Sequence, residues 1–376
     1  MIGMQPEKRN MESGKPNGER EAFRVPSAEW GAGPSALRLP PSAFRTGFTL
    51  VELLVTMIII SILAGITLGV LQKAHQAADT AKTRSMIARL HNQIMLRWEG
   101  YRTRRVPLNI AVPVGDPYAN DPKYVAGKRL IAMRELMRLE LPERYTDITD
   151  EPVLINPKKG SQPATGTAVW QAYSRRYKNN TVNNAPKVPT EQYEGAECLY
   201  MIITMNNEDD FAGAEQFKPK DSGDADGDGM LEFHDAWGQP IEFLRWAPGF
   251  ISDLQPSLDG KDGAAFAGNP DQTANPRQPN VYHDPMDPMK LQKDALALFP
   301  LVYSGGLDRQ SDIYRGSSGF KYQIPASGPN NPYATLTTSL PSGILAPIGA
   351  PFDVDGDGDG DDGSSDNITN HLIGLR

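Results

Sequence analysis

The sequence contains few of the residues that form disulfides or hold transition metals. Its 376 residues include one cysteine, Cys198, and five histidines that are scattered along the chain. A single cysteine excludes an internal disulfide and any cysteine-rich zinc or iron–sulfur site, and the wide histidine spacing argues against a histidine metal cluster. Because Cys198 lies in an apolar stretch, we expect it to be a buried structural thiol rather than a nucleophile.

The sequence also lacks an excess of positive charge and the common motifs of catalysis. Its formal net charge is −8, from 38 Lys and Arg against 46 Asp and Glu, which argues against a general nucleic-acid binder. No nucleophile elbow, zinc-peptidase helix, phosphate loop or dinucleotide fingerprint occurs in the sequence. We therefore expect that the protein is not an enzyme and that nucleic acid is not its primary partner.

One long apolar run interrupts this otherwise polar chain. Residues Phe48 to Leu71 carry a single charge, on Glu52, and about 20 apolar residues are enough to span a bilayer as a helix. An ordinary signal anchor and a cleaved secretory signal are the two simplest interpretations. The second is disfavoured, because the run is longer than the ~7–15-residue apolar core of a secretory signal.

Helical periodicity continues beyond the apolar run. Small and apolar side chains recur every four or five residues and form one stripe that comprises Ala77, Ala81, Met86, Leu90, Ile94 and Trp98. Gly100 suits the end of a helix. We therefore predict one helix from Phe48 to Glu99, with a membrane-spanning segment at 48–72 and an amphipathic continuation at 73–100.

The residues at the head of this helix form a specific motif. Positions 45–53 read Arg-Thr-Gly-Phe-Thr-Leu-Val-Glu-Leu, which resembles the processing site of type IV prepilins and type II secretion prepseudopilins. The resemblance implies that residues 1–47 are a leader, that a prepilin peptidase cuts between Gly47 and Phe48, and that the new amine of Phe48 is methylated. This leader is longer than is usual in that superfamily, so a later methionine is an alternative translation start.

Glu52 stands where that superfamily keeps a glutamate, four residues after the cut. A charged side chain within a membrane-spanning segment costs about 2.5–3.5 kcal/mol on insertion scales, and an ordinary anchor gains nothing by keeping one. The amine of Phe48 on a neighbouring subunit could neutralise Glu52 and set the axial register between packed helices. We therefore expect Glu52 to function in subunit assembly.

The remaining residues, 101–376, are predicted to form a pilin-like globular domain. The chain contains 35 glycines and 32 prolines, which predicts long irregular stretches within a folded body. Local patterns predict helices at 128–141 and 196–204, the second with a start signal at Thr190, short strands at 241–246 and 298–303, and loops at 154–190 and 255–293. The expected fold class is α+β, with the long N-terminal helix packed on a small antiparallel sheet with long loops.

An acidic segment at 224–235 matches the twelve-residue calcium loop closely. The candidate ligands are Asp224, Asp226, Asp228, the backbone carbonyl of Met230, Glu232 and Asp235, with Gly229 at the turn and Leu231 as the apolar anchor. So many carboxylates repel one another unless a cation compensates them, so we predict calcium as a cofactor. Asp235 departs from the pattern, since an EF-hand loop usually ends in glutamate, and a solvated acidic turn is the alternative.

A second acidic run near the C-terminus gives a weaker calcium signal. It consists of Asp353, Asp355, Asp357, Asp359 and Asp361, followed by Asp366, and it lacks an apolar anchor. Residues 303–308 together with 366–368 resemble the calcium-binding C-terminal loop of the major pseudopilin of type II secretion. The stretch Asp235-Ala-Trp-Gly-Gln-Pro resembles the turn that leads into the sheet of that protein, where Trp237 would pack on the core.

The resemblance implies a structural subunit of a pseudopilus in a type II secretion-like system. Its expected partners are copies of itself, other pilin or pseudopilin subunits, the prepilin peptidase and the inner-membrane assembly platform. Its expected location is the inner (cytoplasmic) membrane, crossed once, with the globular domain in the periplasm or outside the cell, and then the filament. Two alternatives remain: a type IV pilin or minor pilin for adhesion, motility or DNA uptake, and a membrane-anchored calcium-dependent binding protein that never polymerises.

Overall fold

The computed structural model describes part of the chain in detail. The described residues are 47–106, 121–205, 213–252, 254–255, 283–291, 297–316, 348–351 and 366–372. The chain divides into two units, Met1–Leu63 and Ala64–Arg376, and the boundary falls inside the first helix. All but the last residue of the predicted leader lies outside the described residues, so the limits of the leader and of the globular domain stay predictions.

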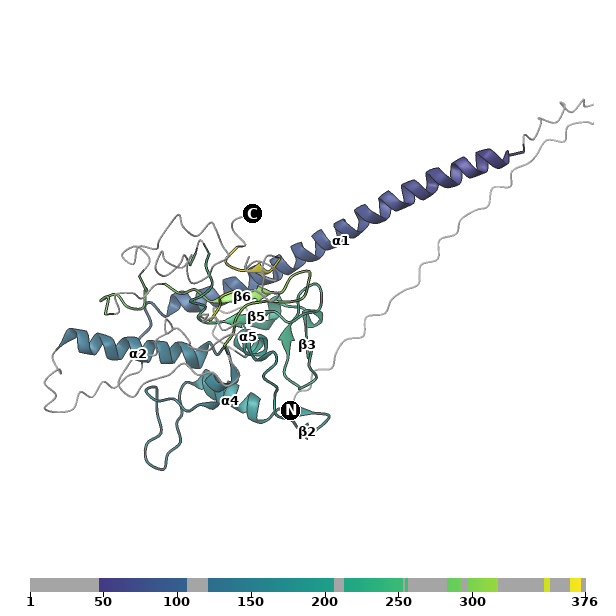
Figure 1. Cartoon of the computed structure of the whole chain (residues 1–376). Helices are drawn as coiled ribbons and strands as arrows, with labels where there is room; N and C mark the ends of the chain where they lie inside the picture. The colour runs from purple at the N-terminus through teal and green to yellow at the C-terminus, as the bar shows by residue number, and fades with distance from the viewer. Residues whose placement is uncertain are drawn as a thin grey trace, which may run out of the picture. The chain divides into compact units, whose positions relative to one another are not determined.

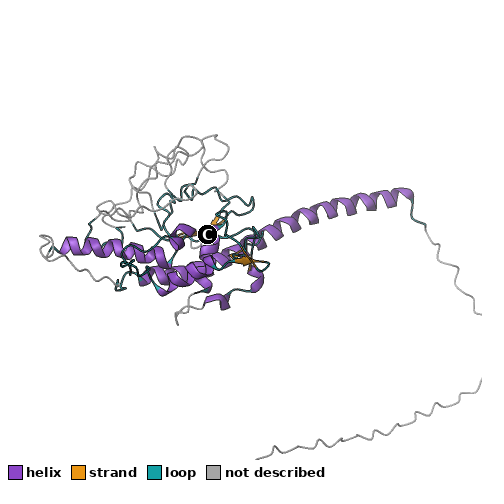
Figure 2. Cartoon of the chain, turned by 90° about the horizontal axis from the view of Figure 1, so that it is seen from below, coloured by secondary structure: helices purple, strands orange, loops and turns teal. Residues whose placement is uncertain are grey.

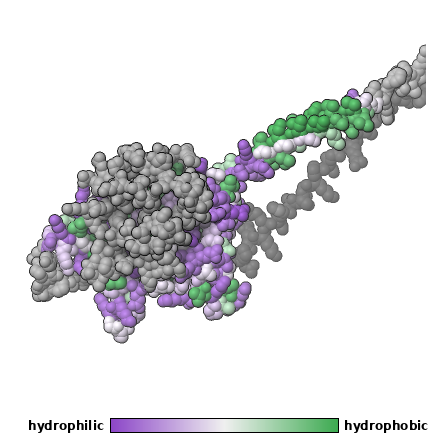
Figure 3. Space-filling model, viewed as in Figure 1, coloured by the Kyte–Doolittle hydropathy of each residue, from purple (hydrophilic) through white to green (hydrophobic). Residues whose placement is uncertain are grey.

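The first helix, α1, is a single helix of 51 residues from Leu50 to Gly100, which confirms the prediction of one long N-terminal helix (Figure 1). It begins two residues later than predicted because Thr49 occupies the capping position before its first turn. The first half of α1 is apolar and exposed (Figure 3). By length and composition α1 can cross a membrane once.

The second half of α1 packs on the folded body of the Ala64–Arg376 unit. Its buried residues are Thr83, Met86, Ile87, Leu90, Gln93, Ile94 and Trp98. The predicted stripe is therefore correct from Met86 onward and wrong at Ala77 and Ala81, which are exposed. The packed face starts at Thr83, whose hydroxyl oxygen accepts the backbone N–H of Ala236 at 3.0 Å.

The described residues contain four further α-helices: α2 (Pro122–Glu140), α3 (Tyr145–Thr149), α4 (Ala168–Lys178) and α5 (Glu194–Thr204). Helix α2 starts earlier than predicted because Asp121 caps it, accepting the N–H of Lys123 at 2.8 Å, and Pro122 fills its first position. Helix α4 lies inside 154–190, so the prediction of loop throughout that segment is wrong. Thr167 caps α4 by accepting the N–H of Trp170 at 3.1 Å.

The strands are short and pair only in antiparallel fashion among the described residues. They are β1 (Thr181–Val182), β2 (Ala185–Pro186), β3 (Ser222–Gly223), β4 (Glu232–Phe233), β5 (Glu242–Leu244), β6 (Leu301–Ser304) and β7 (Ile368–Thr369), with short 3-10 helices at Gly213–Gln216 and Pro219–Asp221. Strands β1 and β2 form one two-stranded sheet, β3 and β4 form another, and the third sheet has three strands in the order β5-β6-β7. In that sheet Phe243 pairs with Val302, and Tyr303 pairs with Thr369. Strand β5 lies within the predicted strand 241–246, and β6 overlaps the predicted strand 298–303 and ends one residue after it.

One of the buried apolar clusters joins the helices to strands β4 to β7. Helix α5 lies against β4 and β5, and its Leu199 and Ile202 belong to the same buried cluster as Ile94 of α1 and Phe243 and Val302 of the sheet. Cys198 is buried in this cluster, as predicted, and burial raises the pKa of its thiol well above the ordinary value. Helices form more of the described structure than strands do, and the sheets are small (Figure 2). The architecture is the predicted α+β mixture, consistent with a pilin-like fold.

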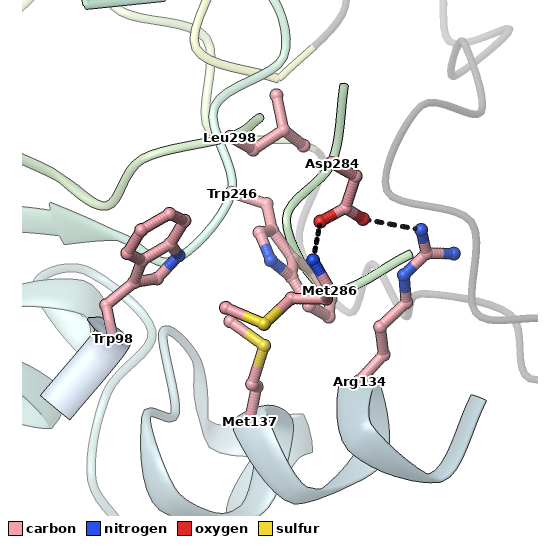
Figure 4. A pocket seen from close by; sticks show the side chains of 7 residues that line it. All are labelled: Trp98, Arg134, Met137, Trp246, Asp284, Met286 and Leu298. Atoms are coloured by element: carbon pink, nitrogen blue, oxygen red, sulfur yellow. Dashed lines mark hydrogen bonds and ion pairs between the residues drawn. The ribbon is translucent and has the colours of Figure 1, made fainter. Parts of the chain in front are cut away.

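A buried ion pair holds the described segment 283–291 against α2. Arg134 lies 3.0 Å from Asp284, and the second carboxylate oxygen of Asp284 accepts the N–H of Met286 at 2.9 Å (Figure 4). The cavity beside this pair, which Trp98 and Trp246 also line, has a volume of about 10 Å³. That volume suits one water molecule, so this cavity is too small for an organic ligand.

Candidate functional site

Gly47 and Phe48 lie directly before the first turn of α1. Both are exposed, and the side chain of Phe48 is 80% exposed. A Cβ placed on Gly47 would meet nothing within 4 Å, so there is open space beside this residue. The predicted cut therefore falls at an accessible bond just outside a helix.

Glu52 takes part in a capping box at the head of α1. The hydroxyl oxygen of Thr49 accepts the N–H of Glu52 at 3.2 Å, and the Glu52 carboxylate accepts the N–H of Thr49 at 2.9 Å. The Thr49 hydroxyl also donates to the same carboxylate at 3.1 Å. This reciprocal pattern satisfies N–H groups that the first turn leaves without helical partners. Glu52 thus also stabilises the start of the helix. The free-energy cost of a charged side chain within the membrane does not include this local contribution.

The acidic loop wraps its carboxylates around its own backbone. Asp224 accepts the N–H groups of Asp228 and Gly229, both at 2.9 Å, and Asp228 accepts the N–H of Met230 at 2.7 Å. Gly229 has a φ of 99°, a conformation that suits glycine at the sharp turn of such a loop. The first part of the loop therefore has the compact form that the calcium-loop pattern predicts.

Thr190 belongs to this loop rather than to the start of α5. Its hydroxyl donates to Asp226, and its backbone N–H donates to Asp228 at 2.6 Å. Helix α5 begins four residues later, at Glu194, so the prediction of Thr190 as a helix start is wrong. The segment before α5 instead places Thr190 within hydrogen-bond distance of Asp226 and Asp228, two of the predicted ligands.

Glu197, which the calcium-loop pattern does not include, lies beside the same two carboxylates. Ligand oxygens of Glu197, Asp226 and Asp228 all lie within 4.8 Å of one another. Glu197 is 0% exposed, and neither of its carboxylate oxygens has a hydrogen-bond partner among the described residues. Burial, followed by the charges of Asp228 and Asp226, raises the pKa of Glu197 to about 10. This acidic cluster could hold a metal ion.

The last residues of the calcium-loop pattern do not join this cluster. Asp235 accepts the N–H groups of Trp237 at 2.8 Å and Gln239 at 2.9 Å with one oxygen, and the hydroxyl of Ser304 at 2.7 Å with the other. It closes the turn before β5. The group of converging oxygens therefore includes Glu197, which the loop pattern does not contain, and does not include Asp235, which the pattern does contain.

The residues between the cluster and that turn also depart from the loop pattern. Met230 is buried, with 1% exposure, whereas Leu231, the expected apolar anchor, is 36% exposed. Glu232 lies on β4, where one oxygen accepts the N–H of Ala225 and the other is buried without a hydrogen-bond partner among the described residues. The chain therefore leaves the loop pattern after Met230 and enters a strand.

The C-terminal loop brings together the two segments that the resemblance joins. Asp366 accepts the N–H groups of Leu307 at 2.7 Å and Asp308 at 3.1 Å, and β6 pairs with β7 beside them. Burial raises the pKa of Asp312 nearby, with smaller effects of Asp308 and Asp366. The other predicted ligands of this second site, Asp353 to Asp361, lie outside the described residues.

The exposed apolar first half of α1, the accessible Gly47–Phe48 bond and the adjacent Glu52 together match a known family signature. Residues 44–68 match the model of the prokaryotic N-terminal methylation motif. No curated protein and no solved structure matches the chain. This match supports a relationship of the chain to type IV pilins and pseudopilins, whose N-terminal motif it resembles.

Proposed function

We propose that this protein is a structural subunit of a pseudopilus in a type II secretion-like system. In this proposal the prepilin peptidase cuts after Gly47, Phe48 is methylated, and the mature subunit assembles through α1 with copies of itself and with related subunits. The methylation motif at residues 44–68 is the observation that carries the proposal. A structural role also agrees with the sequence, which lacks the common catalytic motifs.

The exposed surface of α1 supports both the location and the assembly. Apolar side chains between Leu50 and Leu71 are 46–80% exposed, and a surface this apolar requires a bilayer or neighbouring helices. The subunit would cross the inner membrane once, with its globular part on the periplasmic side, and enter the filament from the assembly platform. Helix contacts between subunits would then replace helix contacts with lipid.

Two features favour a secretion pseudopilin over a type IV pilin. The single cysteine is buried, so no disulfide can close a C-terminal loop of the kind that many pilins have. The turn from Asp235 leads directly into β5, with Gly238 at a φ of 81° and Trp237 packed against the core. This arrangement agrees with the turn signature of the major pseudopilin.

Calcium is the ion that we propose for the acidic cluster. The ligands on offer are carboxylate oxygens, which hard cations prefer, and calcium accepts the irregular geometry of a loop more readily than magnesium does. A weak site is sufficient in an extracytoplasmic compartment, where calcium-binding modules have dissociation constants of about 10⁻⁴–10⁻³ M. The ion would stabilise the folded loop rather than take part in a reaction.

The assembly role of Glu52 can be separated from its capping role by two substitutions. Glu52→Ala removes both the charge and the capping box, whereas Glu52→Gln removes the charge and keeps a side chain that can cap. If Glu52 pairs with the amine of Phe48 on a neighbour, both variants should insert in the membrane but copurify several-fold less with wild-type subunits. Copurification of tagged and untagged full-length chains from membranes measures this.

The same experiment distinguishes the competing interpretations. Thr56→Ala, which removes a polar group from the next turn of α1, is the matched control and should assemble normally. Wild-type assembly of Glu52→Gln together with weak assembly of Glu52→Ala would mean that capping, and not charge, is what Glu52 provides. Absence of self-association in the wild-type chain with its peptidase would contradict the proposed filament role.

A further inference from the structure

The three converging carboxylates come from two distant parts of the chain. Asp226 and Asp228 belong to the acidic loop, whereas Glu197 belongs to α5, near its N-terminal end. Helix α5 packs against β4, the strand that follows the loop. The packing of a helix against a loop–strand unit thus brings the third carboxylate to the first two.

The burial of Glu197 has no compensation within the described chain. Its neighbours on α5, Cys198 and Leu199, are fully buried in the apolar core, and an apolar residue would serve packing better at this position. A buried carboxylate without a hydrogen bond or a counter-charge is costly. Two unpartnered oxygens beside two further carboxylates are therefore an arrangement that a cation would stabilise.

Side chains from outside the loop donate hydrogen bonds to its backbone. The carbonyl oxygens of Gly227, Asp228 and Gly229 accept hydrogen bonds from Lys187 at 2.6 Å, Asn180 at 2.8 Å and Arg176 at 2.7 Å. These three donors hold the backbone of the loop in place. The carboxylate oxygens of Asp226 and Asp228 lie beside those of Glu197.

We propose that Glu197 is the closing ligand of a calcium site that it forms with Asp226 and Asp228. The proposal rests on the calcium binding proposed above and adds a ligand that the calcium-loop pattern does not include. An EF-hand loop closes with a glutamate that offers two oxygens from its twelfth position. Here that position holds Asp235, whose oxygens bind the following turn and Ser304, and Glu197 offers two unpartnered oxygens from α5 instead. The ion would join α5 to the acidic loop.

Calcium titration of the full-length chain in detergent micelles, after treatment with chelator, tests this assignment. The heat of calcium binding that is lost in the double variant Asp226→Ala, Asp228→Ala belongs to this site. Glu197→Gln should weaken calcium binding at the site by about tenfold or more. Asp235→Asn should bind as the wild type does, and so should the matched control Glu194→Gln, which removes one charge from the same helix.

The outcomes separate the ligand assignment from the calcium proposal. Wild-type affinity in Glu197→Gln, or a loss of affinity in Asp235→Asn equal to that expected for Glu197→Gln, would overturn Glu197 as the closing ligand and leave calcium binding standing. Absence of calcium binding by the wild-type chain would contradict the calcium proposal itself. Equal affinity for magnesium chloride would overturn calcium as the preferred ion. A melting temperature of Glu197→Gln in chelator close to that of the wild type shows that the variant is folded.

Discussion

Glu194, in the first turn of α5, is half-buried and accepts the backbone N–H of Tyr145 at 2.9 Å. Burial raises its pKa to about 7, an effect that the positive charge of Arg144 partly offsets. The carboxyl group binds its proton more tightly in the folded than in the unfolded chain, whose ordinary value is 4.5. Its contribution to stability is therefore present below pH 4.5 and is lost as the pH rises to 7.

Between pH 5 and pH 8 the wild-type chain should lose about 2 kcal/mol more stability than Glu194→Gln. The glutamine keeps an oxygen for Tyr145 and carries no charge, so it isolates the titration. Urea unfolding of the two full-length chains in detergent at both pH values measures the difference. Parallel pH dependence of the two chains would show that Glu194 does not titrate in this range.

Which residues form the acidic cluster could be predicted only in part. The calcium-loop spacing includes Asp226 and Asp228, whose carboxylate oxygens lie close together because residues two apart in a loop share local geometry. It could not indicate Glu197, which reaches the loop through the tertiary packing of α5. A single glutamate inside the apolar stretch 196–204 was the available signal, since an acid is rarely buried without a partner.

At the scale of elements, Glu135 of α2 connects that helix to the segment before α4. Its carboxylate is fully buried and accepts three backbone N–H groups, those of Val153 at 2.6 Å and of Leu154 and Ile155 at 2.7 Å. Arg138 lies 3.8 Å away. The segment 153–155 has no strand partner among the described residues, so this one side chain supplies its hydrogen bonds.

Glu135→Ala should lower the free energy of unfolding by about 3 kcal/mol or more, since it leaves the buried N–H of Ile155 unpaired. Glu151→Ala, a change of the exposed acid two residues before Val153, is the matched control and should alter stability by less than about 0.5 kcal/mol. Urea unfolding followed by near-ultraviolet circular dichroism compares the two variants. Equal stability of both variants would mean that segment 153–155 does not depend on Glu135.

The elements themselves were predictable where periodicity is long. Helix α1 combines a long apolar run with a periodic apolar stripe over its 51 residues, so its existence could be predicted from the sequence. Helix α4 has 11 residues between segments rich in asparagine and proline, so the composition of its flanks concealed it. Its buried Trp170 and Tyr173 are three residues apart, the spacing that marks one face of a helix.

At the scale of the whole molecule, the sequence of α1 serves two environments. Residues up to Leu71 present apolar side chains outward on all sides, and those from Thr83 onward bury one face in the core of the Ala64–Arg376 unit. A helix that is apolar all round is stable in lipid or among other such helices. In the filament proposal, the first part of α1 lies in the membrane before assembly and packs against neighbouring subunits after assembly.

The mass of the mature protein tests the central claim most directly. Full-length chain produced with an active prepilin peptidase should be recovered from membranes without its first 47 residues, as a 329-residue chain that begins at Phe48 and carries one additional methyl group. This mass does not depend on which methionine starts translation. Gly47→Val should block the cut, because the peptide bond follows a residue without a side chain, whereas Gly65→Val, a change of another exposed glycine, should leave it intact. An intact leader in the wild-type chain, or a cut beyond Leu71, would contradict the account.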